Sequence, residues 1–221
     1  MDIKKSKHNS RREFLKTTGS ITIGFCLWEG CSSPDSEGTV VSALPRTINR
    51  YPNINAWIEI MEDGYIRVLT GKMELGQGIR IAVAQVAAEE LNTDIDMVEV
   101  KLAETGRTPD EGYTAGSRSI EGSAMAIRYA AAAAKEKILA LATEKMNIDK
   151  SQLLMKNGKV TAKKSDASLS FAQILEGAQI EDEVQAPIQL KSKSEFSLAG
   201  KPIHRKDIER MARGKQVYVQ D

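Results

Sequence analysis

Two short loops contain residue types that can bind an anionic or heteroaromatic ligand. The first is Gly76-Gln77-Gly78, inside the stretch KMELGQGIRIAVAQVAAEEL at residues 72–91. Glycines let the backbone approach a ligand closely, and free N–H groups at the start of a helix attract anionic oxygens. The amide of Gln77 both donates and accepts hydrogen bonds, which suits the edge of a heteroaromatic ring. The candidates are an ordinary tight turn, a phosphate-binding loop and a binding site for a larger cofactor.

The second loop is Thr114-Ala115-Gly116-Ser117-Arg118-Ser119. Gly116 permits close approach, Ser117 and Ser119 offer hydroxyls beside backbone donors, and the dipole of a following helix would favour an anion. Serine and threonine also cap helices, so capping is the simpler interpretation of this loop by itself. The first loop lacks the G-x-G-x-x-G pattern of a dinucleotide site and the Gly-Lys-Ser/Thr ending of a P-loop.

Each loop joins a strand-rich segment to an alanine-rich helical segment. Alternating residues predict a hairpin from Ala56–Met61 and Tyr65–Thr70, because Asp-Gly between such runs favours a tight turn. A helix is expected over 79–91 and a strand over 96–103. The longest helix is expected over 124–147, where five consecutive alanines indicate close packing against a sheet. Two loops in such positions could converge on one extended anionic cofactor.

The rest of the chain predicts smaller elements. Asn157-Gly158 indicates a second hairpin, and residues 169–178 a short helix capped by Ser168 or Ser170. Residues 186–196 are strand-like, and the polar tail from 199 becomes apolar at Val217–Val219. We therefore expect an α+β fold, with short β-hairpins and a mixed sheet packed against two main helices.

Composition narrows the possible functions. The chain has 221 residues, 41% hydrophobic and 28% charged, which is typical of one or two globular domains. Lys+Arg 31 against Asp+Glu 30, with 5% aromatics, gives no basic field or stacking platform, so no nucleic-acid partner is expected. Cys26 and Cys31 form no C-x-x-C pair, and His8 and His204 have no metal-spaced partner. We expect no metal ligand and no iron–sulfur cluster on this chain.

Residues 1–42 are interpreted as a signal peptide of the twin-arginine (Tat) type and a polar linker. The motif SRREFLK at residues 10–16 precedes a short, moderately apolar run from Ile21 to Trp28. That run is shorter than the ~20 residues that span a bilayer as a helix. It therefore predicts export to the periplasm rather than a membrane-spanning helix. Cys31 is a less well matched lipidation site, which leaves membrane association as an alternative.

The two loops in this order resemble the molybdenum hydroxylases of the xanthine dehydrogenase and aldehyde oxidase family. The resemblance lies in two stretches, GKMELGQGIRIAVAQVAAEEL at residues 71–91 and TPDEGYTAGSRSIEGSAMAIRYAAAAA at residues 108–134. The chain is most similar to the molybdopterin-binding large subunits of the isoquinoline 1-oxidoreductase beta type. The resemblance runs from about Asn55 to the C-terminus, with a molybdopterin-binding segment over 55–195.

The resemblance implies a molybdenum–molybdopterin cofactor, often in the cytosine dinucleotide form. Family members hydroxylate small aldehydes or nitrogen heterocycles with oxygen from water. Their electrons leave through [2Fe-2S] clusters, which in this branch lie on a separate ferredoxin-like subunit. Carried over position by position, Gly76, Gln77 and Gly78 would contact the pterin, and Gly116, Ser117 and Ser119 its phosphate or dinucleotide tail.

The chain departs from the family in what it lacks. The glycine-and-phenylalanine loop beside the metal and the general-base glutamate segment are absent from these residues, and the tail 196–221 resembles the lead-in to a hammerhead-like domain. We therefore expect the N-terminal part of a longer subunit, inactive without its remaining C-terminal part and with no catalytic residue of its own. The alternative is a non-catalytic remnant or periplasmic binding module that keeps the fold without the cofactor.

Overall fold

The computed structural model describes residues 40–41, 43–205 and 207–215. The predicted Tat motif, Cys26, Cys31 and the apolar end Val217–Val219 lie outside these residues, so the predictions made for them stay predictions. All the described residues belong to one unit that begins at Ser36.

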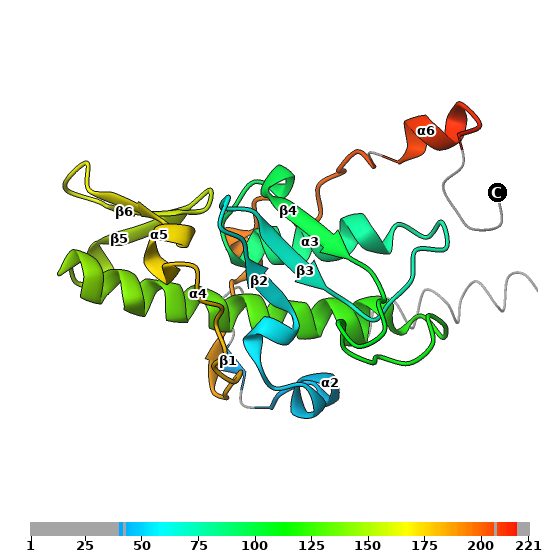
Figure 1. The fold of residues 1–221 in the computed structure, drawn as a ribbon, viewed down its shortest axis with the longest axis horizontal. Coiled ribbons are helices and arrows are strands. Elements are labelled where there is room, and N and C mark those ends of the chain that lie inside the picture. The colour runs from blue at the N-terminus through cyan, green and yellow to red at the C-terminus, as the bar shows by residue number, and fades with distance from the viewer. Residues whose placement is uncertain (1–39, 42, 206, 216–221) are drawn as a thin grey trace, which may run out of the picture. The chain divides into compact units, whose positions relative to one another are not determined.

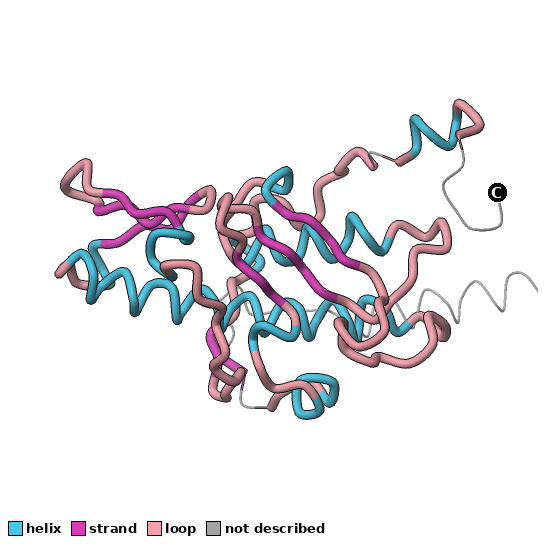
Figure 2. The backbone as a smooth tube through the Cα atoms, viewed as in Figure 1, coloured by secondary structure: helices cyan, strands magenta, loops and turns pink. Residues whose placement is uncertain are grey.

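The central sheet orders its strands β2-β3-β4 (Figures 1 and 2). β2 (Ile58–Ile60) and β3 (Ile66–Leu69) form the first predicted hairpin, with Gly64 in its turn at φ +85°. β4 (Val98–Lys101), the strand expected over 96–103, pairs with β3 in parallel. The sheet is therefore mixed, as the sequence predicted.

The two faces of this sheet differ in polarity because its residues alternate. On the outer face, Arg67 forms ion pairs with Glu59 at 3.3 Å and with Glu99 at 3.1 Å. The other face is apolar, and its buried residues are Ile58, Ile60, Ile66, Val68 and Val100. A sheet of this kind needs cover on one face only.

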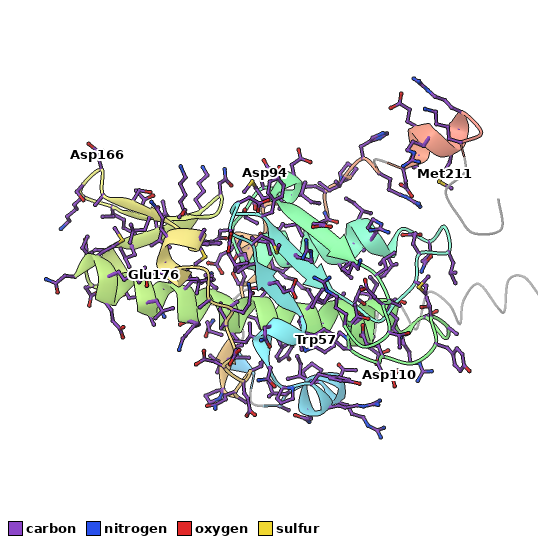
Figure 3. The ribbon with its side chains drawn as sticks, viewed as in Figure 1. Trp57, Asp94, Asp110, Asp166, Glu176 and Met211 are labelled. Atoms are coloured by element: carbon purple, nitrogen blue, oxygen red, sulfur yellow. The ribbon has the colours of Figure 1, made fainter. Side chains whose placement is uncertain are left out.

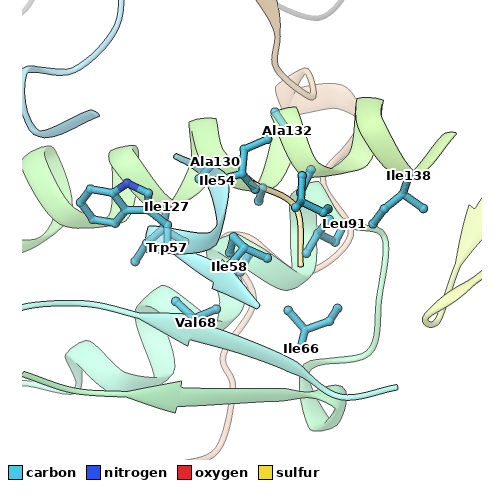
Figure 4. Packing of buried hydrophobic residues seen from close by; sticks show 14 of the residues in the cluster. Ile54, Trp57, Ile58, Ile66, Val68, Leu91, Ile127, Ala130, Ala132 and Ile138 are labelled. Atoms are coloured by element: carbon cyan, nitrogen blue, oxygen red, sulfur yellow. The ribbon is translucent and has the colours of Figure 1, made fainter. Parts of the chain in front are cut away.

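Two long helices provide that cover. α3 (Ile79–Glu90) connects β3 to β4, and α4 (Met125–Met146) follows β4 through a long loop. Ile127 and Ala130 of α4 lie near Ile58 in the core (Figure 4). Of the five alanines of the run, Ala130, Ala131, Ala132 and Ala134 are buried, and α4 contacts both β2 and α3. The helix therefore packs against the sheet, as the alanine run predicted, and also against its neighbouring helix.

A second three-stranded sheet packs beside the carboxyl half of α4 (Figure 1). Asn157 and Gly158 take positive φ values of 47° and 71° in its hairpin, as the Asn-Gly pair predicted. The following helix α5 (Phe171–Leu175) is capped by Ser170, whose hydroxyl accepts from the N–H of Gln173 in a reciprocal capping box. The strands of this sheet are β5 (Leu153–Lys156), β6 (Lys159–Ala162) and β7 (Ser168–Ser170).

The remaining elements are short. β1 (Val40–Val41) pairs with β8 (Ile188–Gln189), so only two residues of the strand-like stretch 186–196 form a strand. Beyond them, the N–H of Lys191 donates to the side chain of Glu90 instead of to a neighbouring strand. The other short elements are α2 (Arg46–Arg50), α6 (Ile208–Ala212) and the single turns η1 (Ile54–Ala56), η2 (Ile95–Met97), η4 (Lys150–Gln152) and η5 (Lys193–Glu195).

Residues 191–205, here called the C-terminal strap, run along α3 from its end towards its start. Glu90 accepts from the first N–H of the strap at 3.1 Å, and Glu89 accepts from the N–H groups of residues 197–199. Gln85 then donates to two carbonyls near residue 200. These polar tethers hold the strap where backbone pairing is absent.

Glu89 is a deeply buried member of these tethers, with 2% of its surface exposed. Burial by itself raises the pKa of its carboxyl. The hydrogen bond from Lys191 and those from the N–H groups of residues 197–199 outweigh that effect and lower the pKa to about 2. Glu89 is therefore ionised whenever the strap is in place at ordinary pH.

Within the described part of the chain, every helix is too short or too polar to cross a bilayer.

Candidate functional site

The two loops start from the same edge of the central sheet. β3 and β4 are parallel, and their last residues, Leu69 and Lys101, lie opposite each other. Loops that follow neighbouring parallel strands must therefore leave the sheet side by side, which is where open α/β sheets bind ligands. The first loop (residues 70–78) leads into α3 and the second (residues 102–118) towards α4 (Figure 1).

In the first loop, the amide of Gln77 is fixed by its own loop. Its Nε2 donates to the carbonyl of Met73 at 2.8 Å, and its Oε1 accepts from the N–H of Leu75 at 2.5 Å. These partners determine which end of the amide is oxygen. An amide has two N–H bonds and two lone pairs, so Gln77 keeps one donor and one acceptor for a ligand. The side chain is exposed, so a ligand can reach it.

Gly76 and Gly78 both have positive φ, at 100° and 82°, which only glycine adopts without strain. Their N–H groups donate to Oε1 of Glu74 at 2.9 and 2.8 Å, and the N–H of Arg80 donates to Oε2 at 3.2 Å. A carboxylate of the chain therefore already occupies the start of α3. The free N–H groups expected from the sequence are not present here, because Glu74 lies close enough to reach back over the turn.

Arg205, in the C-terminal strap, braces the same turn. Its guanidinium donates to the carbonyl of Gly76 at 2.8 Å and lies 3.9 Å from the carboxylate of Glu74. A Cβ added to Gly78 would lie 3.6 Å from this guanidinium. Asp207 pairs with Arg205 at 2.5 Å and fixes the position of the arginine. The Gly-Gln-Gly turn is thus held from inside by Glu74 and from outside by the strap.

In the second loop, Gly116 and Ser117 are consecutive residues with positive φ, at 66° and 57°. Such values are uncommon for a residue with a side chain, so Ser117 carries some backbone strain. Ser119 begins η3 (Ser119–Ala124), a short π-helix that continues into α4. Interruptions of this kind often occur at functional sites. Gly116 and Ser117 are both exposed.

Hydrogen bonds join the two loops. The N–H of Met73 donates to the hydroxyl of Thr114 at 2.8 Å. Lys72, with only 4% of its surface exposed, donates through Nζ to the carbonyls of Glu111 at 2.8 Å and Tyr113 at 3.2 Å. Figure 3 labels the neighbouring Asp110, which forms an ion pair with Arg50 at 3.1 Å.

The carboxylate of Glu111 lies between the bases of the two loops. One of its oxygens lies 2.7 Å from the hydroxyl of Thr70, 2.8 Å from the N–H of Gly71 and 3.0 Å from the hydroxyl of Ser123. Sequence reasoning missed all four of these residues and Lys72. Their types are ordinary in loops, and only the parallel pairing of β3 with β4 brings them together.

The six predicted residues therefore lie on two loops that contact each other. A groove of about 530 Å³ lies between α3, β4 and the C-terminal strap, and its lining includes Glu74 and Arg205, which hold the Gly-Gln-Gly turn, but none of the six. The loops themselves carry exposed apolar residues, Met73 at 46%, Leu75 at 67%, Tyr113 at 91% and Ile120 at 56%. Within the described ranges, no cluster of histidine, cysteine, aspartate or glutamate could hold a metal ion.

Comparison with known proteins identifies the family. Residues 5–214 match the sequence model of the family described as "Molybdopterin cofactor-binding domain". The chain belongs to this family. The molybdopterin-binding assignment expected from the two loop motifs is thus confirmed, and so is the mixed α and β fold class.

Two curated relatives of this molybdopterin-binding chain are components of oxidoreductases. One is a subunit of nicotinate dehydrogenase from Pseudomonas putida, 31% identical over 212 residues that cover 96% of this chain and 17% of that protein. The other is the beta subunit of isoquinoline 1-oxidoreductase from Brevundimonas diminuta, 27% identical over 96% of this chain and 32% of that protein. The chain thus spans less than a third of the length of either relative.

A solved structure also resembles the chain. It is described as reconstituted CO dehydrogenase from Oligotropha carboxidovorans. The likeness covers 80% of this chain and 26% of that one, at 15% identity and a TM-score of 0.49.

The geometry fits a pterin at some of the predicted residues and not at others. Gln77 keeps one donor and one acceptor for a ring edge, and the exposed backbone of Gly116 and Ser117 adjoins the start of η3. The N–H groups of Gly76 and Gly78 are already bonded to Glu74. An anionic group of the cofactor therefore fits better at the second loop, whereas the first loop suits a neutral ring edge.

Proposed function

We propose that this chain is the cofactor-binding part of a molybdenum hydroxylase subunit that hydroxylates aldehydes or nitrogen heterocycles with oxygen from water. The observation that carries the proposal is the pair of motif-bearing loops that leave one sheet edge and are hydrogen-bonded to each other. When bound, the molybdenum cofactor would supply the two-electron redox chemistry. The residues of this chain would bind and orient its organic part.

Gln77 would take the ring edge of the pterin. Two of its four hydrogen-bonding positions are used within the loop, which fixes the amide in advance and reduces the entropy lost on binding. Gly76 and Gly78 would allow the ring to approach the backbone. Gly116, Ser117 and Ser119 would hold the phosphate, or the tail of a cytosine dinucleotide form.

The proposal includes further polypeptide. Both relatives are named as subunits, which supports a partner, here proposed as a small ferredoxin-like subunit with [2Fe-2S] clusters. The remaining C-terminal part of the large subunit would supply the general base and the substrate pocket, so the chain alone would be inactive. The sequence of residues 1–42 supports export by the Tat route to the periplasm.

One observation favours a second function. Glu74 already occupies the anion-binding start of α3 through three N–H groups. A protein that had lost the cofactor but kept the fold would have this self-contained turn. The second candidate is therefore a non-catalytic remnant or periplasmic binding module, which predicts a folded assembly without pterin.

The test is cofactor content in the assembled protein. The full chain is co-expressed with the polypeptides proposed to complete the enzyme, in a host that makes the molybdenum cofactor. Molybdenum is measured by mass spectrometry and pterin by fluorescence after oxidation. We expect both to copurify. Gln77→Ala is expected to lower pterin content at least about tenfold, because the facing ring atoms lose their partners.

The matched control is Gln152→Ala, a glutamine on η4 beside the second sheet. It is expected to retain the pterin content of the parent. A folded parent assembly without pterin would refute the proposed function and support the non-catalytic candidate. Equal pterin content in the parent and in Gln77→Ala would show that Gln77 does not contribute to pterin binding.

A further inference from the structure

Glu111, in the second loop, contacts both the start of the first loop and η3 through a single carboxylate oxygen. Its three partners come from two places in the chain: Thr70 and Gly71 follow β3, and Ser123 lies in η3, just before α4. Thr70 and Ser123 are fully buried and lie 2.8 Å apart through their hydroxyls. The contact is therefore an internal joint between the strand that carries the first loop and the helix that follows the second.

The surrounding backbone shows how closely the loops fit at this joint. A Cβ built on Gly71 would lie 2.1 Å from the carbonyl oxygen of Pro109 and 3.0 Å from the nitrogen of Glu111. Lys72, the residue after Gly71, donates through Nζ to the carbonyl of Glu111 at 2.8 Å. The main chain of Glu111 is thus clamped, and its side chain has little freedom to leave the joint.

A carboxylate suits this position because it only accepts hydrogen bonds. The three partners are two hydroxyls and a backbone N–H, all able to donate. Hydrogen bonds to a charged acceptor are stronger than those between neutral groups. The other oxygen of Glu111 is buried and has no hydrogen-bond partner within the described residues. Among those residues, the hydrogen bonds of this carboxylate therefore all serve the joint.

We propose that Glu111 is a positioning residue that holds the second loop in register with the first. It does so through Thr70, Gly71 and Ser123, and so fixes Gly116–Ser119 relative to Gln77. The consequence for cofactor binding rests on the proposed function, whereas the joint itself does not. Without the carboxylate, each loop would keep its own internal bonds, but the two binding surfaces would no longer be held at a constant separation.

Amide hydrogen exchange of the full chain tests the joint without any cofactor. The variants are Glu111→Ala, which removes the acceptor, and Glu111→Gln, which keeps one acceptor oxygen. Glu121→Ala is the control, because Glu121 is an exposed glutamate on η3. Glu111→Ala is expected to speed exchange in residues 70–73 and 112–119 at least about tenfold, given the usual cost of losing such bonds. The second sheet should exchange as in the parent.

Glu111→Gln is expected to restore most of the protection, and Glu121→Ala to match the parent. The proposal is overturned if Glu111→Ala leaves exchange in both loops unchanged. It is also overturned if Glu111→Ala and Glu111→Gln speed exchange equally throughout the chain, since that is the signature of a general stabilising role. Should Glu111→Ala fail to fold, Ser123→Ala removes a single partner, and unchanged exchange of both loops in that variant would overturn the proposal.

The same variants in the assembled, cofactor-producing system separate the two proposals. Glu111→Ala is expected to lose pterin in parallel with loop protection, and Glu111→Gln to regain it. An assembly that binds no pterin even in the parent refutes the proposed function, while the exchange experiment still decides the role of Glu111.

Discussion

Replacing Gly71 with alanine tests how tightly the two loops are packed. Gly71 follows β3 at the start of the first loop, and the second loop passes directly over it. An added Cβ would lie 2.1 Å from the carbonyl oxygen of Pro109, whereas ordinary contacts of this kind begin well above 3 Å. Both contacting atoms belong to backbone, so no side-chain rotation relieves the overlap. One loop must move by roughly 1 Å, the distance needed to restore van der Waals contact.

The magnitude follows from what that movement breaks. Overpacking of a well-packed site costs about 1–3 kcal/mol. The bond from the Gly71 N–H to the Glu111 carboxylate, 2.8 Å long, would be lost as well, and a bond to a charged group contributes about 1.5–3 kcal/mol. We therefore expect a loss of roughly 2.5–6 kcal/mol in the free energy of unfolding. For a chain of this size, that lowers the melting temperature by roughly 5–24 °C.

The assay is thermal and urea unfolding of the full chain, followed by circular dichroism. The control is Gly122→Ala in η3, where an added Cβ meets no atom within 4 Å and φ is not positive. This change is expected to be neutral or to stabilise by up to about 1 kcal/mol, because alanine lowers the entropy of the unfolded chain. If Gly71→Ala unfolds at the same temperature as Gly122→Ala, the second loop does not pack as tightly over Gly71 as the structure indicates.

Two further predictions concern the strap and the N-terminus. Glu89 has a folded-state pKa of about 2, below its ordinary value of 4.5. Its ionised carboxylate therefore contributes up to about 3 kcal/mol to the free energy of unfolding above pH 4.5, and this contribution is lost as the pH falls towards 2. Glu89→Gln should therefore flatten the pH dependence of the urea midpoint across that window, and an unchanged slope would contradict the assignment. Replacing Arg11 and Arg12 by lysine should keep the protein in the cytoplasm on cell fractionation, while Lys4→Arg should not, and periplasmic recovery of the double variant would rule out the Tat route.

Local patterns predicted the fold well where neighbouring residues decide the structure. Asp63-Gly64 and Asn157-Gly158 both form hairpin turns because their φ values are set within the pair. Ser170 caps α5 with Gln173 three residues later, a purely local pattern. The strand expected over 186–196 is mostly absent, and the N–H of Lys191, two residues beyond β8, donates to Glu90, about a hundred positions earlier, instead of to a strand.

The residues of the candidate site likewise fall into those that local sequence predicts and those that only long-range contacts reveal. The Gly-Gln-Gly turn and the Gly116–Ser119 loop could be located from residue types, and their convergence from the alternation of strand and helix. The carboxylate of Glu74 on the start of α3 depends on a side-chain conformation that sequence does not specify. Glu111 contributes through partners 40 and 12 positions away, so no spacing in the chain reveals it.

The brace from Arg205 has a consequence for the order of events during synthesis. The arginine is 129 positions beyond the glycine carbonyl that it holds, so α3 and the central sheet leave the ribosome long before their turn is supported. Until that late residue emerges, the turn has only its local hydrogen bonds, those of the Glu74 carboxylate and of the Gln77 amide. Any ligand that requires the fully braced turn would therefore be bound only after Arg205 has been translated.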